Sequence, residues 1–315
     1  MACELLVLVE LLPENLARFQ AAGFHVDLAL TPAERAARMS EAGNNIRAVL
    51  TNGSTGLRAE EIARLPRLEI VCALGAGYEN IDLVAAGARG IVVTNGAGTN
   101  DASVADHAMA LLLSVVRGIP NADATLRRGG WKEIRTPRPL LFGKKLGVLG
   151  LGNIGDQIAR RAHRGFEMQV AYHNRKPRND VDYLYRPSPA ALAAWCDYLI
   201  IATPGGPATR HLVDAAVLTA VGPDGFLVNI ARGSVVDTVA LIDALRQHRI
   251  AGAALDVVEG EPVVPEGLLS LGHVVLTPHI AGRSPEAVAA TTTLAIENLA
   301  AHFAGRPVLT PVEPA

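Results

Sequence analysis

The stretch Lys145-Leu-Gly-Val-Leu-Gly-Leu-Gly-Asn-Ile-Gly155 lies near the middle of this 315-residue chain and decides its fold. Its apolar start predicts a buried strand, and Gly150, Gly152 and Gly155 then match the pattern G-x-G-x-x-G. Residues 156–162 predict a helix. In this strand–turn–helix order, the glycines let the backbone approach a diphosphate at the helix N-terminus, where free N–H groups favour negative charge. We predict a dinucleotide site here; the alternative is a purely structural glycine turn.

Apolar runs and helical patterns alternate along the rest of the chain, which is typical of α/β domains with parallel sheets. Further strands are predicted at 5–9, 48–50, 70–73, 91–94, 169–172, 198–202, 226–229, 252–256 and 274–276. Helices are predicted at 13–22, 32–41, 102–117, 189–195, 214–220, 238–247 and 285–303. The helix at 102–117 is apolar on nearly all sides, so we expect it to be buried in a core or against another subunit.

The predicted fold class is therefore α/β, with two Rossmann-like or flavodoxin-like domains, each built on a doubly wound parallel sheet. The closing helix is expected to return to the first domain, because 315 residues leave no room for a third. We predict a discontinuous substrate-binding domain at 1–97 plus 286–315 and an NAD(P)-binding domain at 98–285. A cleft is expected between them.

The composition of the chain argues against nucleic-acid, metal and membrane partners. The formal net charge is −2, from 29 basic and 31 acidic residues, so no nucleic-acid partner is expected. The three cysteines have neither metal-ligand nor disulfide-framework spacing, which predicts no metal site and thiols in a reducing cytoplasm. The short run 5–9 is flanked by Glu4 and Glu10 and favours a strand over a signal peptide. No run approaches the roughly 18 apolar residues of a membrane span, so no membrane association is expected.

The end of the strand after the glycine turn indicates which dinucleotide binds. An acidic residue about 20 positions after the turn usually holds the adenosine ribose of NAD. Here Asn174 occupies that position, followed by Arg175, Lys176 and Arg178. A neutral residue beside cations favours a 2′-phosphate, so we predict NADP(H), with NAD(H) as the alternative. A solvated basic turn, offset by nearby acids, would be the non-functional explanation.

Three later segments place charged side chains at or just beyond the ends of predicted strands, which form the ligand-facing edge of such a sheet. They are Val228-Asn-Ile-Ala-Arg-Gly-Ser-Val-Val-Asp237, Leu255-Asp-Val-Val-Glu-Gly-Glu-Pro262 and Leu276-Thr-Pro-His-Ile-Ala-Gly282.

With these segments, the chain resembles the D-2-hydroxyacid dehydrogenase family from end to end. Within it, the Asn-Arg turn and the closing Asn298-Leu-Ala-Ala-His-Phe-Ala-Gly-Arg-Pro-Val-Leu-Thr-Pro311 are similar to the NADP(H)-preferring glyoxylate, hydroxypyruvate and hydroxyphenylpyruvate reductases. The resemblance implies an oxidoreductase that reduces a small 2-keto acid to the D-2-hydroxy acid, and a homodimer.

The resemblance also implies residue roles. Arg232 would bind the substrate carboxylate and keto oxygen, which suits a planar guanidinium fork. His279 would be the general acid, and Glu261 would orient it and favour its protonated form. Asp256 would lie on the nicotinamide side. The backbone N–H groups of Ala76 and Gly77, in a glycine loop after a strand, would bind the substrate carboxylate. The predicted cofactor-binding residues are Gly150, Gly152, Asn153, Ile154, Asn174, Arg175, Lys176, Thr203, Ile230, Asp256 and Gly282.

Several alternatives remain open at this stage. The family's frequent Gly-Ser after the histidine is replaced by Ala281-Gly282, and the following Arg283 either engages a larger or more acidic substrate or faces solvent. Trp131 and the loop 135–141 either reach the cleft of a neighbouring subunit or make ordinary packing contacts. An NAD-dependent lactate-type or phosphoglycerate-type dehydrogenase is the enzymatic alternative, and a non-catalytic dinucleotide sensor on the same fold is the alternative from another class.

Overall fold

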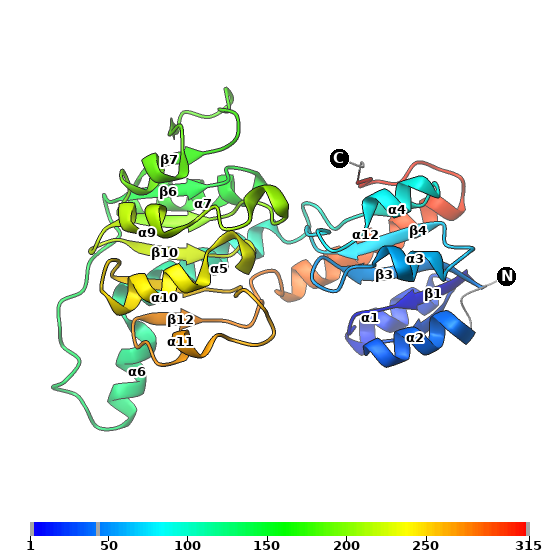
Figure 1. The fold of residues 1–315 in the computed structure, drawn as a ribbon, viewed down its shortest axis with the longest axis horizontal. Coiled ribbons are helices and arrows are strands. Elements are labelled where there is room, and N and C mark those ends of the chain that lie inside the picture. Colours follow the sequence, from blue (N-terminus) through cyan, green and yellow to red (C-terminus); the bar gives the residue numbers. More distant parts are fainter. Residues whose placement is uncertain (1–2, 42–44, 313–315) are drawn as a thin grey trace. The chain divides into compact units, whose positions relative to one another are not determined.

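A computed structural model describes residues 3–41 and 45–312. The chain divides into two compact units, each with its own parallel sheet (Figure 1). Unit 1 comprises Met1–Asn100 and Gly282–Ala315, and unit 2 comprises Asp101–Ala281. The division falls after residues 100 and 281, compared with 97 and 285 in the predicted boundaries. The α/β fold class with two parallel sheets is confirmed, whereas the ligand assigned to each unit stays a prediction.

Unit 1 is built on a five-stranded sheet in the order β2-β1-β3-β4-β5. The strands are β1 (Cys3–Val7), β2 (Phe24–Leu28), β3 (Ile46–Asn52), β4 (Ile70–Leu74) and β5 (Val92–Thr94), all parallel. One face packs on α2 (Pro32–Glu41), α3 (Ala59–Ala63) and α4 (Leu83–Ala88), the other on α1 (Pro13–Ala21) and α12 (Pro285–Phe303). The closing helix α12, expected from the sequence to return to the first domain, packs on β4 and α1.

Unit 2 contains a seven-stranded sheet in the order β12-β11-β10-β9-β6-β7-β8. The strands are β6 (Lys145–Leu149), β7 (Gln169–His173), β8 (Leu184–Tyr185), β9 (Tyr198–Ile201), β10 (Phe226–Asn229), β11 (Gly252–Leu255) and β12 (Val274–Leu276). All pairings are parallel, so the carboxyl ends of the strands share one edge. The order reverses between β6 and β9, and such a switch point is where doubly wound sheets bind ligands.

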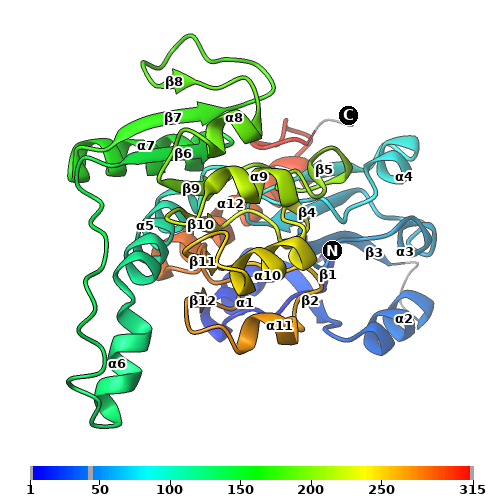
Figure 2. The ribbon, with the colours of Figure 1, turned by 60° about the vertical axis from the view of Figure 1, so that its left-hand side comes forward.

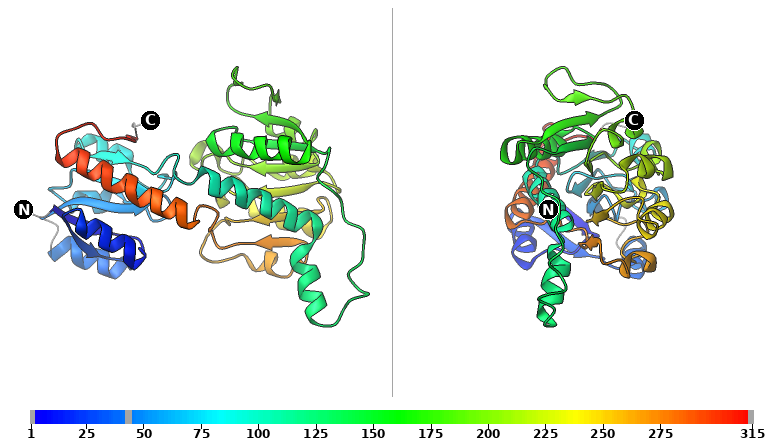
Figure 3. Two further views of the ribbon diagram at one scale, coloured as in Figure 1. Left: turned by 180° about the vertical axis from the view of Figure 1, so that it is seen from behind. Right: turned by 90° about the vertical axis from the view of Figure 1, so that its left-hand side faces the viewer.

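Helices cover both faces of this sheet, as Figure 3 shows from behind. One face packs on α5 (Asp101–Arg117) and α7 (Asn153–Phe166), the other on α8 (Pro189–Ala193), α9 (Ala215–Val221), α10 (Thr238–Arg246) and α11 (Glu266–Leu269). Because both faces are covered, central strands such as β9 are buried at every position and read as unbroken apolar runs. Helix α5, expected to be buried in a core or against another subunit, packs in the core of unit 2 through Val104, Ala108 and Leu112, whereas Asp106 and Ala110 are exposed.

Helix α6 (Ile119–Arg127) was not predicted from the sequence, and with the following segment it extends away from the rest of unit 2 (Figure 2). Short or peripheral elements were also missed, namely β2, β8, α3, α4 and α11. Among the described residues, no single helix is long and apolar enough to cross a membrane. Helices α5 and α6 meet this length and composition only when taken together, and the chain bends by 59° between them.

Candidate active site

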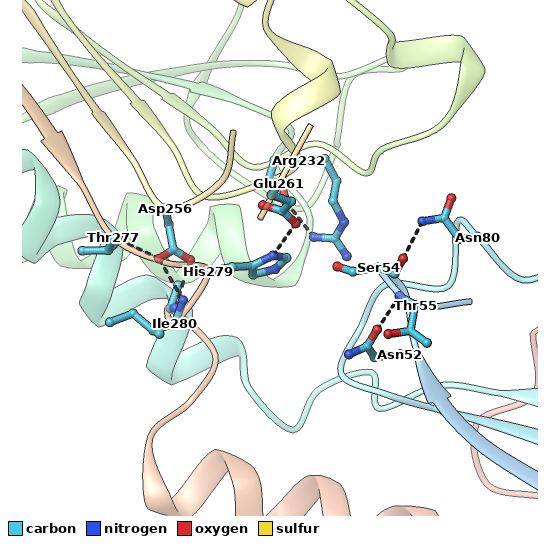
Figure 4. Close-up of polar contacts among 12 residues, drawn as sticks. Asn52, Ser54, Thr55, Asn80, Arg232, Asp256, Glu261, Thr277, His279 and Ile280 are labelled. Carbon is cyan, nitrogen blue, oxygen red and sulfur yellow. Dashed lines mark hydrogen bonds and ion pairs between the residues drawn. The ribbon is translucent and has the colours of Figure 1, made fainter. Parts of the chain in front are cut away.

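Three loops at the carboxyl edge of the unit 2 sheet carry the predicted catalytic residues. Arg232 follows β10, Glu261 lies in the loop after β11, and His279 follows β12. These strands are neighbours in the sheet, so the three residues lie at the same edge although they are far apart in the sequence. Figure 4 shows the side chains of all three residues near one another. The structure thus brings the predicted set together.

His279 and Glu261 form a hydrogen-bonded pair. His279 Nδ1 lies 2.8 Å from Glu261 Oε1, and the imidazole is 38% and the carboxylate side chain 29% exposed. An ionised carboxylate only accepts hydrogen bonds, so Nδ1 carries the hydrogen. The carboxylate thereby orients the ring, and Nε2 is left without a hydrogen-bond partner among the described residues. An imidazole arranged in this way can hold or release a proton at Nε2.

Glu261 is ionised under ordinary conditions. Burial raises the pKa of this carboxyl group, but the hydrogen bond and charge of His279, a backbone hydrogen bond from Val258 and the charge of Arg232 lower it. The net pKa lies below the ordinary value of 4.5. The positive charge of Arg232 therefore acts on the same carboxylate that orients His279.

The loop that carries Arg232 is fixed by Asn229, a buried residue at the end of β10. Its Nδ2 donates to the Arg232 carbonyl at 2.9 Å, and its Oδ1 accepts from the Ala231 N–H at 3.0 Å. The next residue is Gly233, where a Cβ atom would come within 2.1 Å of the Val258 carbonyl carbon. Only glycine allows the loops after β10 and β11 to pack this closely, which places Arg232 beside the Glu261 loop.

The loop that carries His279 is held by Asp256, a buried residue directly after β11. Asp256 Oδ1 accepts from the Thr277 hydroxyl at 2.6 Å and from the Ile280 N–H at 2.9 Å, and Oδ2 accepts from the Ala281 N–H at 2.9 Å. With three donors from one loop, this carboxylate stabilises the backbone around His279. Its predicted place on the nicotinamide side stays a prediction.

The predicted dinucleotide turn has the geometry that its glycines imply. Gly150 has φ +99°, a conformation that side chains disfavour, and a Cβ on Gly155 would come within 2.2 Å of the Gly150 oxygen. A Cβ on Gly152 would meet nothing within 4 Å, so the space there is open. The Asp156 N–H is bonded to the Gly152 oxygen, so the amides of Asn153 and Ile154 precede the helical ladder of α7. These features fit a diphosphate.

Of the basic side chains in the turn after β7, one forms an ion pair within the described part of the chain and two do not. Asn174 Oδ1 accepts from the Leu151 N–H at 2.6 Å, so this side chain joins the strand end to the glycine turn. Arg178 forms an ion pair with Asp180 at 2.5 Å, which raises the pKa of the guanidinium. Arg175 and Lys176 are exposed, and neither has an ion-pair partner among the described residues. This turn fits an anionic group beside the adenosine, as on NADP.

Other predicted residues lie in different places. Thr203, after β9, packs its backbone against Gly150, and Ile230 follows β10 as a buried residue. Gly282 belongs to unit 1, where a Cβ would come within 2.6 Å of Asn100 Nδ2.

Ala76 and Gly77 also belong to unit 1, in the loop after β4. The Ala76 carbonyl accepts from Asn95 Nδ2 at 2.8 Å, and the Gly75 carbonyl accepts from the Gly96 N–H at 2.7 Å. These bonds hold the loop through its carbonyl groups.

Comparisons with known proteins identify the family. Residues 109–281 match the family described as D-isomer specific 2-hydroxyacid dehydrogenase, NAD binding domain. A glyoxylate/hydroxypyruvate reductase of Arabidopsis thaliana is 42% identical over 90% of both chains. A 2-ketogluconate reductase of Gluconobacter oxydans is 42% identical over 85% of this chain and 86% of its own length. The chain belongs to the D-isomer specific 2-hydroxyacid dehydrogenase family.

A solved structure supports this assignment. The NADPH-dependent glyoxylate/hydroxypyruvate reductase of Sinorhizobium meliloti, in complex with NADP and malonate, is 39% identical. It matches with a TM-score of 0.91 over 99% of this chain and 97% of its own. This 2-hydroxyacid dehydrogenase is therefore an NAD(P)-dependent oxidoreductase.

Sequence reasoning missed one contributor to the site of this 2-hydroxyacid dehydrogenase. Asn229 positions the Arg232 backbone, whereas the sequence pattern predicts only the end of a strand at this residue. Its signal was a polar side chain that closes an otherwise apolar run, Phe226-Leu-Val-Asn229. A buried amide in that position needs hydrogen-bond partners, and here the adjacent loop supplies them.

Proposed function

We propose that the protein reduces a small 2-keto acid of the glyoxylate or hydroxypyruvate type to the D-2-hydroxy acid, with NADPH as the preferred cofactor. The observation that carries this proposal is the pair of His279 and Glu261 at 2.8 Å, with the Arg232 charge acting on the same carboxylate. When bound, the nicotinamide supplies the hydride for the carbonyl carbon. The protein must then supply a proton to the oxygen and a cation for the carboxylate.

The proton comes from His279. Its Nδ1 hydrogen is engaged by Glu261, so the proton on Nε2 is the one donated to the carbonyl oxygen as negative charge develops there. Glu261 remains ionised because its pKa is lowered, and its charge stabilises the imidazolium before transfer. After transfer, the neutral ring keeps its orientation through the same hydrogen bond.

The carboxylate and the keto oxygen are bound by Arg232. A planar fork with parallel N–H donors matches the two oxygen atoms of a 2-keto acid, and each charge-assisted bond contributes roughly 1.5–3 kcal/mol. The backbone amides of Ala76 and Gly77 are proposed as further donors to the carboxylate. Their loop is held through its carbonyl groups, which supports a role for its N–H groups.

NADPH preference is proposed from the turn after β7. Asn174 stands where an acidic residue would bind the ribose of NAD, Arg175 and Lys176 directly after it are exposed cations, and Arg178 is paired with Asp180. The solved relative from Sinorhizobium meliloti is described as NADPH-dependent and holds NADP. Comparison of kcat/KM for NADPH and NADH tests this part of the proposal.

We also propose a homodimer in the cytoplasm. Exposed apolar side chains gather on α6 and the segment after it, among them Ile119, Leu126, Trp131 and Phe142. An apolar projection of this kind favours contact with a second copy. Cys72 and Cys196 are free thiols, in keeping with a reducing compartment. Light scattering of the purified protein tests the dimer.

The decisive experiment for the reaction is a turnover assay. Glyoxylate, hydroxypyruvate, phenylpyruvate and 2-ketogluconate are offered separately with NADPH, and the loss of NADPH absorbance is followed. We expect turnover with at least one of the small keto acids and a D configuration of the product. Tight NADPH binding with no turnover on any keto acid would refute the reductase and favour a dinucleotide sensor.

A further inference from the structure

The loop that carries His279 is bonded to helix α5 at both of its ends. At the last residue, Ser103 Oγ donates to the Ala281 carbonyl at 2.7 Å. At the first, His107 Nε2 lies 3.0 Å from Thr277 Oγ1. Ser103 and His107 are four positions apart, so they occupy one face of the helix about one turn from each other. One turn of α5 therefore contacts both ends of the loop.

The direction of these bonds follows from the number of hydrogens. Thr277 has a single hydroxyl hydrogen, which it donates to Asp256 Oδ1 at 2.6 Å. Its oxygen must therefore accept from His107, so His107 Nε2 carries a hydrogen. The same nitrogen lies 3.4 Å from Asp256 Oδ1. His107 thus donates to the residue that begins the loop and lies beside the carboxylate that anchors it.

The backbone conformation of His279 is an unfavourable one, so the contacts that hold its loop matter for the position of this residue. His279 has φ +54°, in the left-handed region that residues with a side chain seldom occupy. Its own N–H donates to the Asp256 carbonyl at 2.8 Å, and its imidazole bonds Glu261. Such a backbone persists only where its surroundings determine it strongly. The bonds from α5 reach the loop ends, whereas the imidazole is held separately, so α5 acts on His279 through its backbone.

We propose that Ser103 and His107 are positioning residues that hold the His279 loop so that the imidazole meets the substrate carbonyl. The inference rests on the proposed function of His279 as the proton donor. Neither residue donates a proton to the reaction. Their effect is geometric, because a displacement of about 1 Å at a reacting group can reduce a rate by about a hundredfold.

The test compares two substitutions at one position. His107→Leu removes the donor, whereas His107→Gln retains an amide N–H close to the place of the imidazole Nε2. Turnover with the keto acid that the wild-type protein reduces fastest is divided by the number of NADPH-binding sites, measured by fluorescence titration. This division removes any loss that comes from unfolded protein.

We expect His107→Leu to lower kcat per NADPH-binding site about tenfold or more, with the KM for NADPH within about twofold of the wild type. His107→Gln should recover most of that loss. Ser103→Ala should lower kcat about threefold and Ser103→Thr much less, because threonine retains the hydroxyl group.

The matched control is His273→Leu. His273 is also a partly buried histidine of unit 2, and its Nε2 lies 3.3 Å from the carbonyl oxygen of Leu245 in α10 rather than from the loop. This variant should keep kcat per NADPH-binding site.

Two results would overturn the inference. In the first, the wild-type protein turns over and His107→Leu keeps its kcat per site. In the second, His107→Leu and His107→Gln lose kcat equally, which would show that the hydrogen bond is not what matters. If the wild-type protein binds NADPH but reduces no keto acid, the proposed function fails first and the inference fails with it.

Discussion

Unit 2 contains two histidine–glutamate pairs that are closely alike in local geometry. His279 lies 2.8 Å from Glu261, and His211 lies 2.9 Å from Glu259. Both histidines have a left-handed backbone, with φ +54° and +50°, and their side chains are 38% and 33% exposed. Distance, burial and backbone conformation therefore do not distinguish the two pairs.

The surroundings of the pairs differ. Glu259 also binds Arg210 at 3.2 Å, and the second ring nitrogen of His211 lies 3.9 Å from Asp237. Carboxylates thus face both nitrogens of His211, one of them within hydrogen-bond distance. Among the residues that the structure describes, the imidazole of His279 is bonded through Nδ1 alone. A histidine held on one side and open on the other can exchange a proton with a ligand, whereas one enclosed by two acids stabilises loops. The predictions that follow test this distinction.

The largest effect is expected at the two histidines themselves. His279→Ala should lower kcat about 10²- to 10⁴-fold, because the proton donor is lost while the dinucleotide turn is untouched. His211→Ala should change kcat by less than about fivefold, since a partly exposed ion pair contributes roughly 0–1 kcal/mol. Steady-state kinetics and NADPH titration provide both values. Equal losses in the two variants would remove the basis for choosing His279.

The next effect concerns the arginine beside each pair. Arg232→Lys should lower kcat/KM for the keto acid about 10- to 100-fold, because lysine cannot make the bidentate contact. Arg210→Lys keeps a charge beside Glu259 and should leave kcat/KM within about twofold. If Arg232→Lys retained full activity, Arg232 would not bind the carboxylate.

A similar contrast between open and paired cations is expected in the turn after β7. Arg175→Ala should raise the KM for NADPH about tenfold and leave that for NADH nearly unchanged, because only NADPH carries the 2′-phosphate. Arg178→Ala is the control, since this side chain is paired with Asp180, and it should affect both cofactors alike. A parallel rise for both cofactors in the Arg175 variant would refute the predicted selection.

The smallest effect is expected at the glutamates of the two pairs. The pKa of Glu261 is lowered, so the carboxylate is ionised at neutral pH and loses its charge only as the pH falls through that lowered value. Glu261→Gln removes this charge from the acceptor that orients the His279 ring. The variant should therefore lower kcat/KM for the keto acid about three- to tenfold at neutral pH, measured by steady-state kinetics. Glu259→Gln should leave kcat/KM unchanged.

Much of the fold could be predicted because its central elements are strongly patterned. The bounds of β10, β12, α2 and α12 agree with the predicted ranges, and each is a mainly apolar run or a long helical pattern. The missed strands β2 and β8 lie at sheet edges, where partial exposure leaves no continuous apolar run. Helix α6 contains Pro120 and has few buried residues, so little in its sequence marks a packed helix.

The site divides in the same way. The sequence by itself determined the dinucleotide turn and the presence of Arg232, Glu261 and His279, because a glycine pattern between strand and helix, and charges at strand ends, depend on local chain order. Only the tertiary structure decided which cation after β7 is already paired, which histidine–glutamate pair has an open nitrogen, and that α5 bonds the loop of His279. These properties depend on hydrogen bonds between residues far apart in the chain, and local periodicity does not record such contacts.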